Sequence, residues 1–485
     1  MNFLNLYFYF ILAIIFLFLR YSYSLENIPH IKLLGLYLSI YIMVIPLYFI
    51  VIIDNSLYGF QNMNILKSHL YWGLDGISLV FIILTVILIP LSIIANWNNI
   101  KNSNFYILIL LILEILLIIL FSVLDIFYFY IVFELTLPCL FALIGLAGNR
   151  FKIKASLYIF IYTMLGSLFL LISILFIIKI FGSTDFFSLF NNNINNLHQS
   201  YIFIGLFIAF AVKTPLLPLH IWLLKAHVES PLSGSMILAG IILKLSAFGI
   251  IRLIIPITPK SLWDYSIYLG ILGIITIIII SISTIRASDI KELIAYSSIS
   301  HAAVYILGII SNNIQGIEGG ILLGLGHGFV SPALFIISGG ILYDRYHSRD
   351  INSIRGVIQI MPIFSIFFFL FTLSNCGVPL SLNFIGEFLS LYGFFEKLPI
   401  LGIFASLSII LSAGYSIFLF NRITFGNYLS INYTLPSISD VYKHENYMLI
   451  YLALLTIVLG VFPKICLNII SLNISGLVFR PTDIF

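Results

Sequence analysis

The chain has 485 residues, of which 61% are hydrophobic and only 9% are charged. An average soluble domain has about 25% charged residues, so this chain has too little polar surface to cover a water-soluble globule. Its apolar runs are continuous and about 20 residues long, which predicts membrane-spanning helices rather than the short alternating strands of a barrel. The formal net charge of +4 is small and dispersed, which argues against nucleic-acid binding.

The cysteines and the first apolar run limit the chemistry further. Cys139, Cys376 and Cys466 are far apart and lie in apolar segments. A disulfide framework, a zinc site or an iron–sulfur cluster requires clustered thiols, so we expect no metal and no redox cofactor on this chain. The run at 3–19 has neither a basic n-region nor a cleavage site, which predicts a retained first span.

Hydropathy, turn residues and charges predict an all-α integral membrane protein with about fourteen transmembrane helices. Span seven contains Pro215 and Pro218, and span twelve is long and contains Gly377 and Pro379. We therefore expect both spans to be broken helices. In chain order the predicted spans are 3–19, 31–53, 74–96, 104–123, 125–147, 155–180, 201–223, 232–254, 263–285, 292–311, 316–343, 357–392, 400–421 and 446–470.

The whole chain, 1–485, is expected to form a single polytopic membrane domain. Two broken helices five spans apart predict two five-helix repeats of inverted topology, spans 4–8 and 9–13. This divides the chain into N-terminal helices one to three (1–103), a first repeat (104–254), a second repeat (263–421) and a C-terminal helix with its tail (446–485).

Basic residues predict the orientation. With fourteen spans, the loops after odd-numbered spans hold 14 of the 23 Lys and Arg residues, and the opposite loops hold seven. By the positive-inside rule, the odd loops face the compartment of synthesis and both termini face away from it.

Three ionisable residues lie near the middle of predicted spans: Glu134, Lys213 and Lys244. A charge at the bilayer centre costs about 2.5 to 3.5 kcal/mol, so such residues should be paired or hydrated inside the protein. We predict a Glu134–Lys213 pair. Opening or closing this pair would change the proton affinity of Lys213, which can then pass its proton to Lys244.

Histidines extend this polar line, because an imidazole can take a proton on one nitrogen and release one from the other. His220 follows Lys213 by two helical turns and is therefore expected on roughly the same face. His301 in SSISHAAV and His327 in GLGHGFVSPALF carry the line into the second repeat, and Glu387 in NFIGEF is its expected far end. The alternative for each histidine is a structural hydrogen bond between two helices.

Glu114, Lys225 and His227 are further candidates with strong structural alternatives. Glu114 lies deep in LILEILLIIL without an obvious partner, so it is either a relay group or a tie between helices. Lys225 and His227 lie with Glu229 near a span end, where a hydrated turn is the alternative interpretation.

Several motifs together resemble one family. The run VKTPLLPLHIWLLKAHVESPLSGSMILAGIILKL, with FELTLPCL before it and AYSSISHAAV, GHGFVSPALFIISGGILYDR and NFIGEF after it, resembles the antiporter-like membrane subunits of respiratory complex I. The resemblance extends from about Trp72 to Arg422. It implies a fourteen-helix proton-pumping subunit with inverted repeats and discontinuous seventh and twelfth helices. NADH, FMN, iron–sulfur clusters and ubiquinone would then be used elsewhere in the complex.

The resemblance also implies roles for particular residues. Glu134 and Lys213 resemble the charge pair of the family, Lys244 its central lysine and Glu387 its exit-side carboxylate. The polar-axis positions are His220, His301 and His327. Lys225 in WLLKAH departs from the family, because bacterial relatives commonly have WLPDAH at this point.

The implied partners are other membrane-arm subunits of complex I, especially the antiporter-like chains 2 and 5, and lipids such as cardiolipin. The implied location is the mitochondrial inner membrane, with both termini on the intermembrane-space side. Two alternatives stay open. One is a stand-alone cation/proton antiporter of the related bacterial type, and the other is a structural spacer of the membrane arm.

Overall fold

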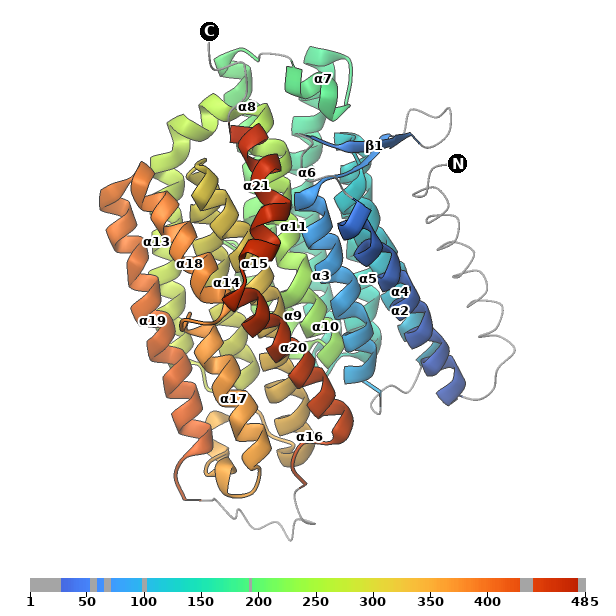
Figure 1. Cartoon of the computed structure of the whole chain (residues 1–485), viewed down its shortest axis with the longest axis vertical. Coiled ribbons are helices and arrows are strands. Elements are labelled where there is room, and N and C mark those ends of the chain that lie inside the picture. The colour runs from blue at the N-terminus through green and yellow to red at the C-terminus, as the bar shows by residue number, and fades with distance from the viewer. Residues whose placement is uncertain are drawn as a thin grey trace.

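A computed structural model describes residues 28–52, 59–64, 71–97, 103–191, 194–427 and 439–478. These residues form one bundle of long helices that lie side by side (Figure 1). Within the described ranges, eleven helices are long and apolar enough to cross a membrane. This confirms the predicted all-α integral membrane protein. The predicted first span, 3–19, lies outside the described residues, and the total of fourteen spans and the inverted repeat stay predictions.

The first part of the chain follows the predicted spans to within a few residues. Asp75 and Asp125 cap two of its helices, because their side chains accept backbone N–H groups of the first turn. The helices are α2 (Ile28–Ile52), α3 (Gly76–Ala95), α4 (Ser103–Ser122), α5 (Ile126–Ala147), α6 (Lys152–Phe181), the short α7 (Phe186–Asn191), α8 (Asn196–Lys213) and α9 (Ile221–Glu229).

The predicted eighth span is one continuous helical rod with two π-helical segments, η1 and η2. In chain order its segments are α10 (Leu232–Ile237), η1 (Leu238–Ile242), α11 (Leu243–Gly249), η2 (Ile250–Ile254) and α12 (Ile255–Ile257). A π segment accommodates one extra residue in a turn and is often found at functional sites.

The second part of the chain also consists mainly of long helices. Prolines begin α13, α17 and α19, where the missing N–H has no partner in any case. The elements are α13 (Pro259–Arg286), α14 (Ile290–Ile310), α15 (Ile314–Phe335), η3 (Ile336–Leu342), α16 (Tyr343–Tyr346), η4 (Ile351–Ser353), η5 (Val357–Gln359), α17 (Pro362–Asn375), α18 (Leu382–Lys397), α19 (Pro399–Thr424), α20 (Lys443–Val461) and α21 (Lys464–Val478).

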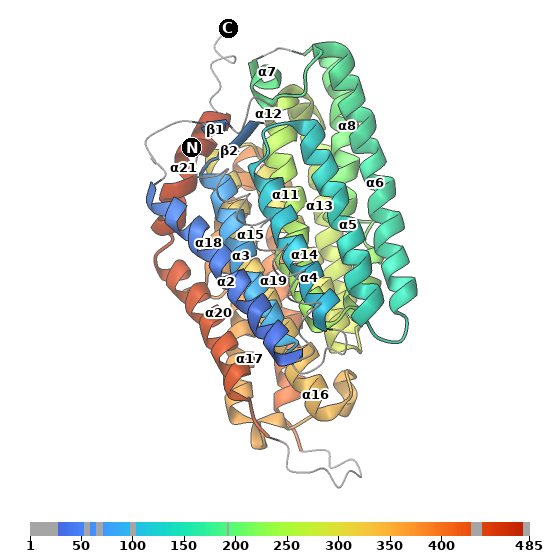
Figure 2. The ribbon, with the colours of Figure 1, turned by 90° about the vertical axis from the view of Figure 1, so that its right-hand side faces the viewer.

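One small sheet interrupts the helical architecture and was not predicted. Strands β1 (Gln61–Asn64) and β2 (Tyr71–Leu74) are antiparallel, with Gln61 opposite Leu74 and Asn64 opposite Tyr71. This hairpin lies beside the ends of α3 and α4, at the top of the molecule (Figures 1 and 2). We call this the hairpin end.

Both predicted breaks are present. Span seven is divided into α8 and α9 by residues 214–220, and span twelve into α17 and α18 by residues 376–381. In the first break, the Leu216 N–H donates to the Ala211 carbonyl at 3.1 Å and the Trp222 indole donates to the Val212 carbonyl at 2.9 Å. Carbonyls that the prolines leave free are thus satisfied inside the protein, as a membrane interior requires.

Among the described residues, the loops after predicted spans five, seven, nine, eleven and thirteen gather at one end. Hydrogen bonds join the segment after α5 to the end of α9 (Asn149 N–H to the Glu229 carbonyl, 2.9 Å) and the start of α14 to the segment after α16 (Ile290 N–H to the Arg349 carbonyl, 3.0 Å). The segment after α16 also reaches the end of α19. We call this the α9 end. It lies opposite the hairpin end (Figure 2).

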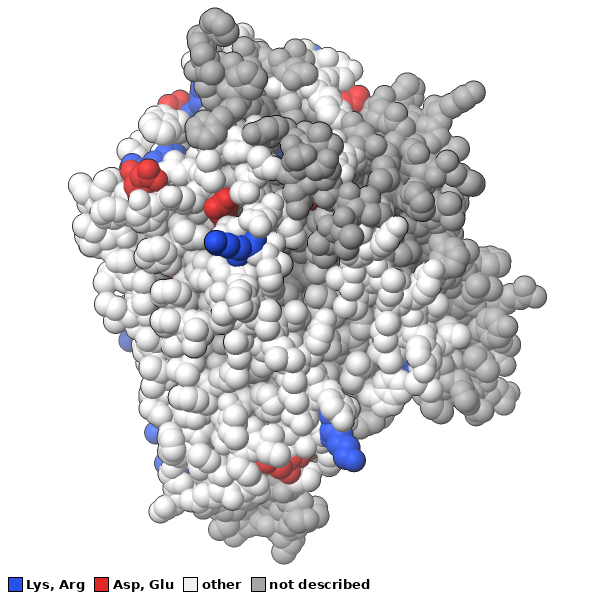
Figure 3. Space-filling model, viewed as in Figure 1, with Lys and Arg blue, Asp and Glu red and all other residues white. Residues whose placement is uncertain are grey.

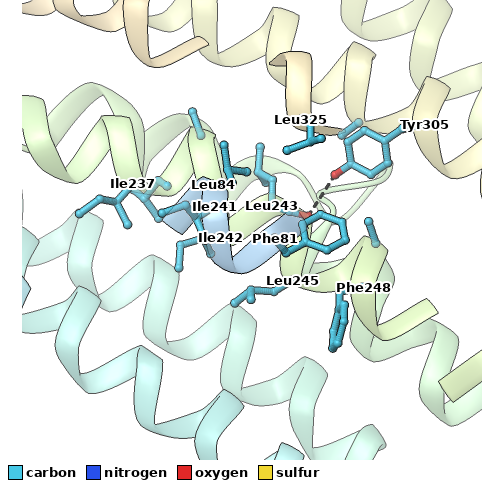
Figure 4. Packing of buried hydrophobic residues seen from close by; sticks show 14 of the residues in the cluster. Phe81, Leu84, Ile237, Ile241, Ile242, Leu243, Leu245, Phe248, Tyr305 and Leu325 are labelled. Atoms are coloured by element: carbon cyan, nitrogen blue, oxygen red, sulfur yellow. Dashed lines mark hydrogen bonds between the residues drawn. The ribbon is translucent and has the colours of Figure 1, made fainter. Parts of the chain in front are cut away.

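The innermost helices are the rod 232–257, the rod 314–346 and α14. In the most apolar stretch of each, 100%, 100% and 94% of the residues are buried. In α6 and α19 the corresponding values are 33% and 39%. Figure 4 shows the packing between the inner helices, where Phe81 and Leu84 of α3 lie beside the rod and the Tyr305 hydroxyl of α14 donates to the Leu243 carbonyl at 3.0 Å. The face in Figure 3 is largely uncharged between its two ends.

Candidate functional site

Lys244 lies in α11, in the middle of the fully buried eighth span. Its Nζ donates to the Ala239 carbonyl at 2.6 Å and lies 2.9 Å from His327 Nδ1. An ammonium has only donors, so a protonated Lys244 requires His327 to present an unprotonated Nδ1. A proton can therefore pass between these two side chains without any change in their packing.

The line continues from His327 to Glu387. The rings of His327 and His301 lie with their centroids 5.4 Å apart. His301 Nδ1 lies 2.9 Å from Glu387 Oε1, and all three side chains are buried. Side chains from α11, α15, α14 and α18 thus form a series of contacts in the order Lys244, His327, His301 and Glu387, in which the two histidines stand in the reverse of their order in the sequence.

The break between α17 and α18 positions the last member of this series. Gly377 has a left-handed backbone with φ of +69°. A Cβ atom added there would lie 2.5 Å from Glu387 Oε2. Only glycine adopts this conformation readily and leaves room for the carboxylate. The backbone of the break at Gly377 therefore lies close to the Glu387 side chain.

Sequence reasoning missed a group that contacts His301 on its other side. The Tyr415 hydroxyl of α19 lies 3.4 Å from His301 Nε2 and 3.2 Å from the Ser300 hydroxyl. Both histidine nitrogens therefore have a partner, Glu387 at Nδ1 and Tyr415 at Nε2. A buried tyrosine hydroxyl normally has a partner, but nothing in the sequence indicates which one.

The predicted Glu134–Lys213 pair is looser than a direct ion pair. The two groups interact electrostatically, but among the described residues Lys213 Nζ has no hydrogen-bond partner. Lys213 Nζ instead lies over the ring of Phe133, 4.1 Å from its centroid. Lys213 is buried at the end of α8, and Glu134 is half-buried in α5 and also interacts with Ser167.

Aromatic rings lie beside both lysines, with Phe133 under Lys213 and Phe248 one turn after Lys244 in α11. Phe133 packs edge-on against Phe210 with centroids 6.4 Å apart, and Phe129 stacks near Phe248 at 6.4 Å. No hydrogen-bonded link between the two lysines is present in the part of the chain that the structure describes. From Lys244 to Glu387 the side chains are in contact, with a ring contact rather than a hydrogen bond between His327 and His301, whereas the line is interrupted between Lys213 and Lys244.

His220 does not lie on a shared helical face with Lys213, because the helix ends at Lys213 and residues 214–220 form turns. The predicted shared face was therefore wrong, because the helix does not continue through Pro215 and Pro218 and residues cannot be counted by helical turns across them. His220 is half-buried and, with Lys225, lines a cavity of about 590 Å³ between α6, α9 and α14. Lys225 itself is exposed.

His227 is completely buried, and its ring stacks on Phe335 with centroids 4.9 Å apart. Neither ring nitrogen has a hydrogen-bond partner among the described residues. His227 interacts electrostatically with Lys244 and with Lys291. The predicted hydrated turn is therefore wrong for His227, although it fits the exposed Lys225.

Lys291 is a second group that sequence reasoning missed. It lies in the first turn of α14, is buried, and donates from Nζ to the Ser230 carbonyl at 2.6 Å. In the sequence it stands just outside a predicted span and was assigned to a loop. Its burial depends on the packing of α14 at the centre of the bundle.

Glu114 is completely buried in α4, and neither carboxyl oxygen has a hydrogen-bond partner within the described ranges. It belongs to none of the series above. The structure thus supplies no link from Glu114 to the polar line.

Two further buried ion pairs connect distant parts of the chain. Arg252 in η2 pairs with Asp75, the cap of α3, at the hairpin end. Arg345 donates through both terminal nitrogens to Glu445, at 2.7 and 2.6 Å, at the opposite end. Neither pair touches the polar line, so we assign both to structure. No group of three or more His, Cys, Asp or Glu side chains suited to a metal occurs in the described residues.

The helical bundle with two broken helices and a buried line of ionisable side chains is that of the antiporter-like membrane proteins. Residues 123–412 match the family described as NADH:quinone oxidoreductase/Mrp antiporter, transmembrane. Among solved structures, the chain is similar to one in respiratory complex I from Thermus thermophilus, with a TM-score of 0.82, 26% identity and coverage of 92% of this chain and 95% of that one.

Curated relatives narrow the assignment. Proteins called NADH-ubiquinone oxidoreductase chain 4 are 46% identical in Mycosarcoma maydis, over 87% of this chain and 86% of the relative, and 40% identical in Arabidopsis thaliana, over 96% and 94%. The chain belongs to the NADH-ubiquinone oxidoreductase chain 4 family. The Mrp complex from Dietzia has a chain of the same fold, with a TM-score of 0.88, 15% identity and coverage of 100% of this chain and 99% of that one.

Proposed function

We propose that this chain is a proton-translocating membrane subunit of NADH:ubiquinone oxidoreductase, and that it has no redox centre of its own. The observation that carries the proposal is the buried contact series Lys244, His327, His301 and Glu387. Such a series is costly to bury and has groups that both donate and accept protons. Membership of the family supports the same reading.

The proposed cycle uses the interrupted and the continuous parts of the line differently. Energy from quinone reduction in neighbouring subunits changes the Glu134–Lys213 interaction and thereby the proton affinity of Lys213. Water that enters between Phe210 and Phe248 connects Lys213 to Lys244. The proton then moves through His327 and His301 to Glu387, which releases it.

We further propose that protons reach the line from the α9 end through Lys291 and His227. Lys291 is held on the Ser230 carbonyl at that end, and His227 interacts with both Lys291 and Lys244. The unpartnered nitrogens of His227 leave both sides of its ring available for a proton or a water molecule.

The proposed setting is that of the family. The neighbours of this chain are the other membrane-arm subunits of complex I, with antiporter-like chains 2 and 5 beside it and cardiolipin among the lipids. The chain lies in the mitochondrial inner membrane with both termini on the intermembrane-space side. The excess of Lys and Arg in the odd loops supports this orientation.

The test is NADH-driven proton pumping by the assembled complex in proteoliposomes. Lys244→Met and Glu134→Gln should abolish or strongly reduce pumping, because each removes an ionisable group from the line. Lys179→Met is the matched control, since Lys179 is exposed in the last turn of α6. Full coupled pumping in both line variants contradicts the proposal.

The likeness to the Mrp complex gives one specific competitor, a stand-alone cation/proton antiporter. Sodium flux through the purified chain without the other subunits would favour that function. A structural spacer is the other competitor, and it predicts that Lys244→Met leaves pumping intact in fully assembled complex.

A further inference from the structure

The cavity beside α9 has the size and position of a ligand site. It is bounded by α6, α9 and α14 and has a volume of about 590 Å³, within the range of about 300 to 1,000 Å³ for small-molecule pockets. It extends along α9 from Glu229, at the α9 end, to His220, beside the break. The long axis of the cavity therefore follows the bundle from its end toward its middle.

Charged side chains of both signs lie where the cavity meets the α9 end. Lys154 stands in the first turn of α6, Lys225 and Glu229 in α9, and Glu292 in the first turn of α14. Lys225 and Glu292 interact electrostatically. The Glu229 carboxylate accepts the Phe151 N–H at 3.1 Å, which fixes the end of α9 against α6. Neither lysine donates a hydrogen bond to any described residue of the wall.

Deeper in the cavity the wall is mainly apolar and aromatic, with His220 at its inner end. Tyr158 on α6 and Ile221 on α9 are 40% and 42% exposed, and Leu224 and Tyr296 also line this part. The apolar face of α6 continues beyond the cavity through Ile161. Charges at the bundle end and apolar side chains further in are the order of groups in a membrane lipid, from headgroup to acyl chain.

We propose that this cavity binds phosphatidylethanolamine, a phospholipid whose headgroup carries both a phosphate and a primary ammonium. Lys154 and Lys225 bind the phosphate, and Glu292 and Glu229 receive the ammonium. One acyl chain lies along Tyr158 and Ile221 toward the exposed face of α6. The proposal does not depend on the proton pathway, because none of these contacts belongs to the Lys244–Glu387 series.

The mixed charges distinguish this headgroup from the other common ones. Cardiolipin has two phosphates and no cation, so Glu229 and Glu292 would repel it. The quaternary ammonium of phosphatidylcholine has no N–H to donate to a carboxylate, whereas a primary ammonium has three.

The experiment uses the intact complex in proteoliposomes that contain phosphatidylethanolamine with a photoactivatable diazirine in one acyl chain. After illumination, adducts on this chain are mapped by peptide mass spectrometry. We expect adducts on peptides with residues 155–161 or 221–224. Unlabelled phosphatidylethanolamine should compete at least about fivefold better than phosphatidylcholine or cardiolipin. Competition is measured on the unmodified complex and so does not depend on any variant folding.

A charge variant tests the headgroup contacts. Lys154→Gln combined with Glu292→Gln should reduce the adducts at these peptides by at least about fivefold, while Lys179→Gln, at the other end of α6, should leave them unchanged. Assembly of each variant is checked on native gels. Equal competition by phosphatidylcholine, preferential competition by cardiolipin, or no adduct at these peptides overturns the proposal. The last result would mean that water or a neighbouring subunit fills the cavity.

Discussion

The polar line is built differently in its two halves. From Lys244 to Glu387 each ionisable side chain touches the next, and the last lies close to Gly377 in the broken helix. Around Lys213 the buried ammonium has an aromatic ring beneath it and no hydrogen-bond acceptor within the described residues. Under the proposed function, the second half needs only a short rearrangement at the His327–His301 step, whereas the first half needs a new link between Lys213 and Lys244.

The energetic consequences of the two arrangements are opposite. A buried polar group without a partner costs about 1 to 3 kcal/mol, and more if it is charged. Lys213 lies over the Phe133 ring without a hydrogen-bond acceptor among the described residues, so a Glu134 contact or a water molecule would stabilise its charged form. Lys244 has two hydrogen-bond partners, the Ala239 carbonyl and His327 Nδ1, so this cost is largely avoided there.

The largest effect is expected for Glu387→Gln, which breaks the connected half at its end. The amide keeps the shape of the carboxyl group and can still hydrogen-bond His301, but it cannot take up a proton. General acid–base groups contribute about 10²- to 10⁴-fold, so we expect NADH-driven pumping to fall by at least about tenfold.

The matched control for this change is Glu396→Gln. Glu396 lies on the same helix, is exposed, and accepts a hydrogen bond from Asn313 at 3.0 Å. Equal pumping by both variants would show that the continuous contacts carry no protons.

A somewhat smaller loss of NADH-driven pumping is expected for Gly377→Ala, which leaves every ionisable group in place. The added Cβ would lie 2.5 Å from Glu387 Oε2 and so must displace the carboxylate from His301. We expect pumping to fall about fivefold, as for the loss of about 1 kcal/mol of contact energy.

Two glycines separate backbone strain from displacement of the carboxylate. Gly182 has the same φ of +69° but nothing within 4 Å of an added Cβ, and Gly414 has nothing near it and no positive φ. Gly182→Ala should cost only backbone strain, about 1 to 2 kcal/mol, and Gly414→Ala nothing measurable. If Gly182→Ala lowers pumping as much as Gly377→Ala does, displacement of Glu387 is not the cause.

The stability of two lysine variants should change in opposite directions. Lys213→Met replaces an unpartnered buried amine with an apolar chain of similar shape, so we expect stabilisation by about 1 to 3 kcal/mol. Lys244→Met leaves the Ala239 carbonyl and His327 Nδ1 without their partner and should destabilise by a similar amount. The measurement is the temperature at which this subunit is lost from the complex. Destabilisation by Lys213→Met would mean that Lys213 has a partner in the membrane.

The smallest effect is expected for Tyr415→Phe. The hydroxyl contacts His301 Nε2 at 3.4 Å, a long hydrogen bond whose loss should slow pumping about threefold. Tyr392→Phe, at an exposed position of α18, is the control. A change larger than that of Gly377→Ala would make Tyr415 a member of the line rather than a positioning residue.

The sequence predicted the helical class, both broken helices and the members of the connected half. Those predictions rested on one strong signal, because ionisable side chains in the middle of apolar spans have few structural explanations. Lys244, His327, His301 and Glu387 all carry this signal. Tyr415 does not, since tyrosine is frequent throughout this chain and only tertiary packing selects one of 28.

The failures have equally specific causes. His220 was placed by counting helical turns across Pro215 and Pro218, where the helix does not continue. Lys291 stands at a span boundary, and its burial depends on helices that pack around α14 rather than on its own segment. The spacing of Glu134 from Lys213 depends on two flexible side chains and a helix end, none of which leaves a pattern in the sequence.

The π segments on either side of α11 have a mechanical consequence. Each accommodates one surplus residue, so transfer of one residue from η1 to η2 would turn the seven-residue cylinder between them by about 100° while both ends of the rod stay where they are. This rotation would carry the Lys244 side chain away from His327. A structure of the complex during turnover with η1 converted to a regular α-helix would reveal this rotation, and an unchanged η1 in every state would exclude it.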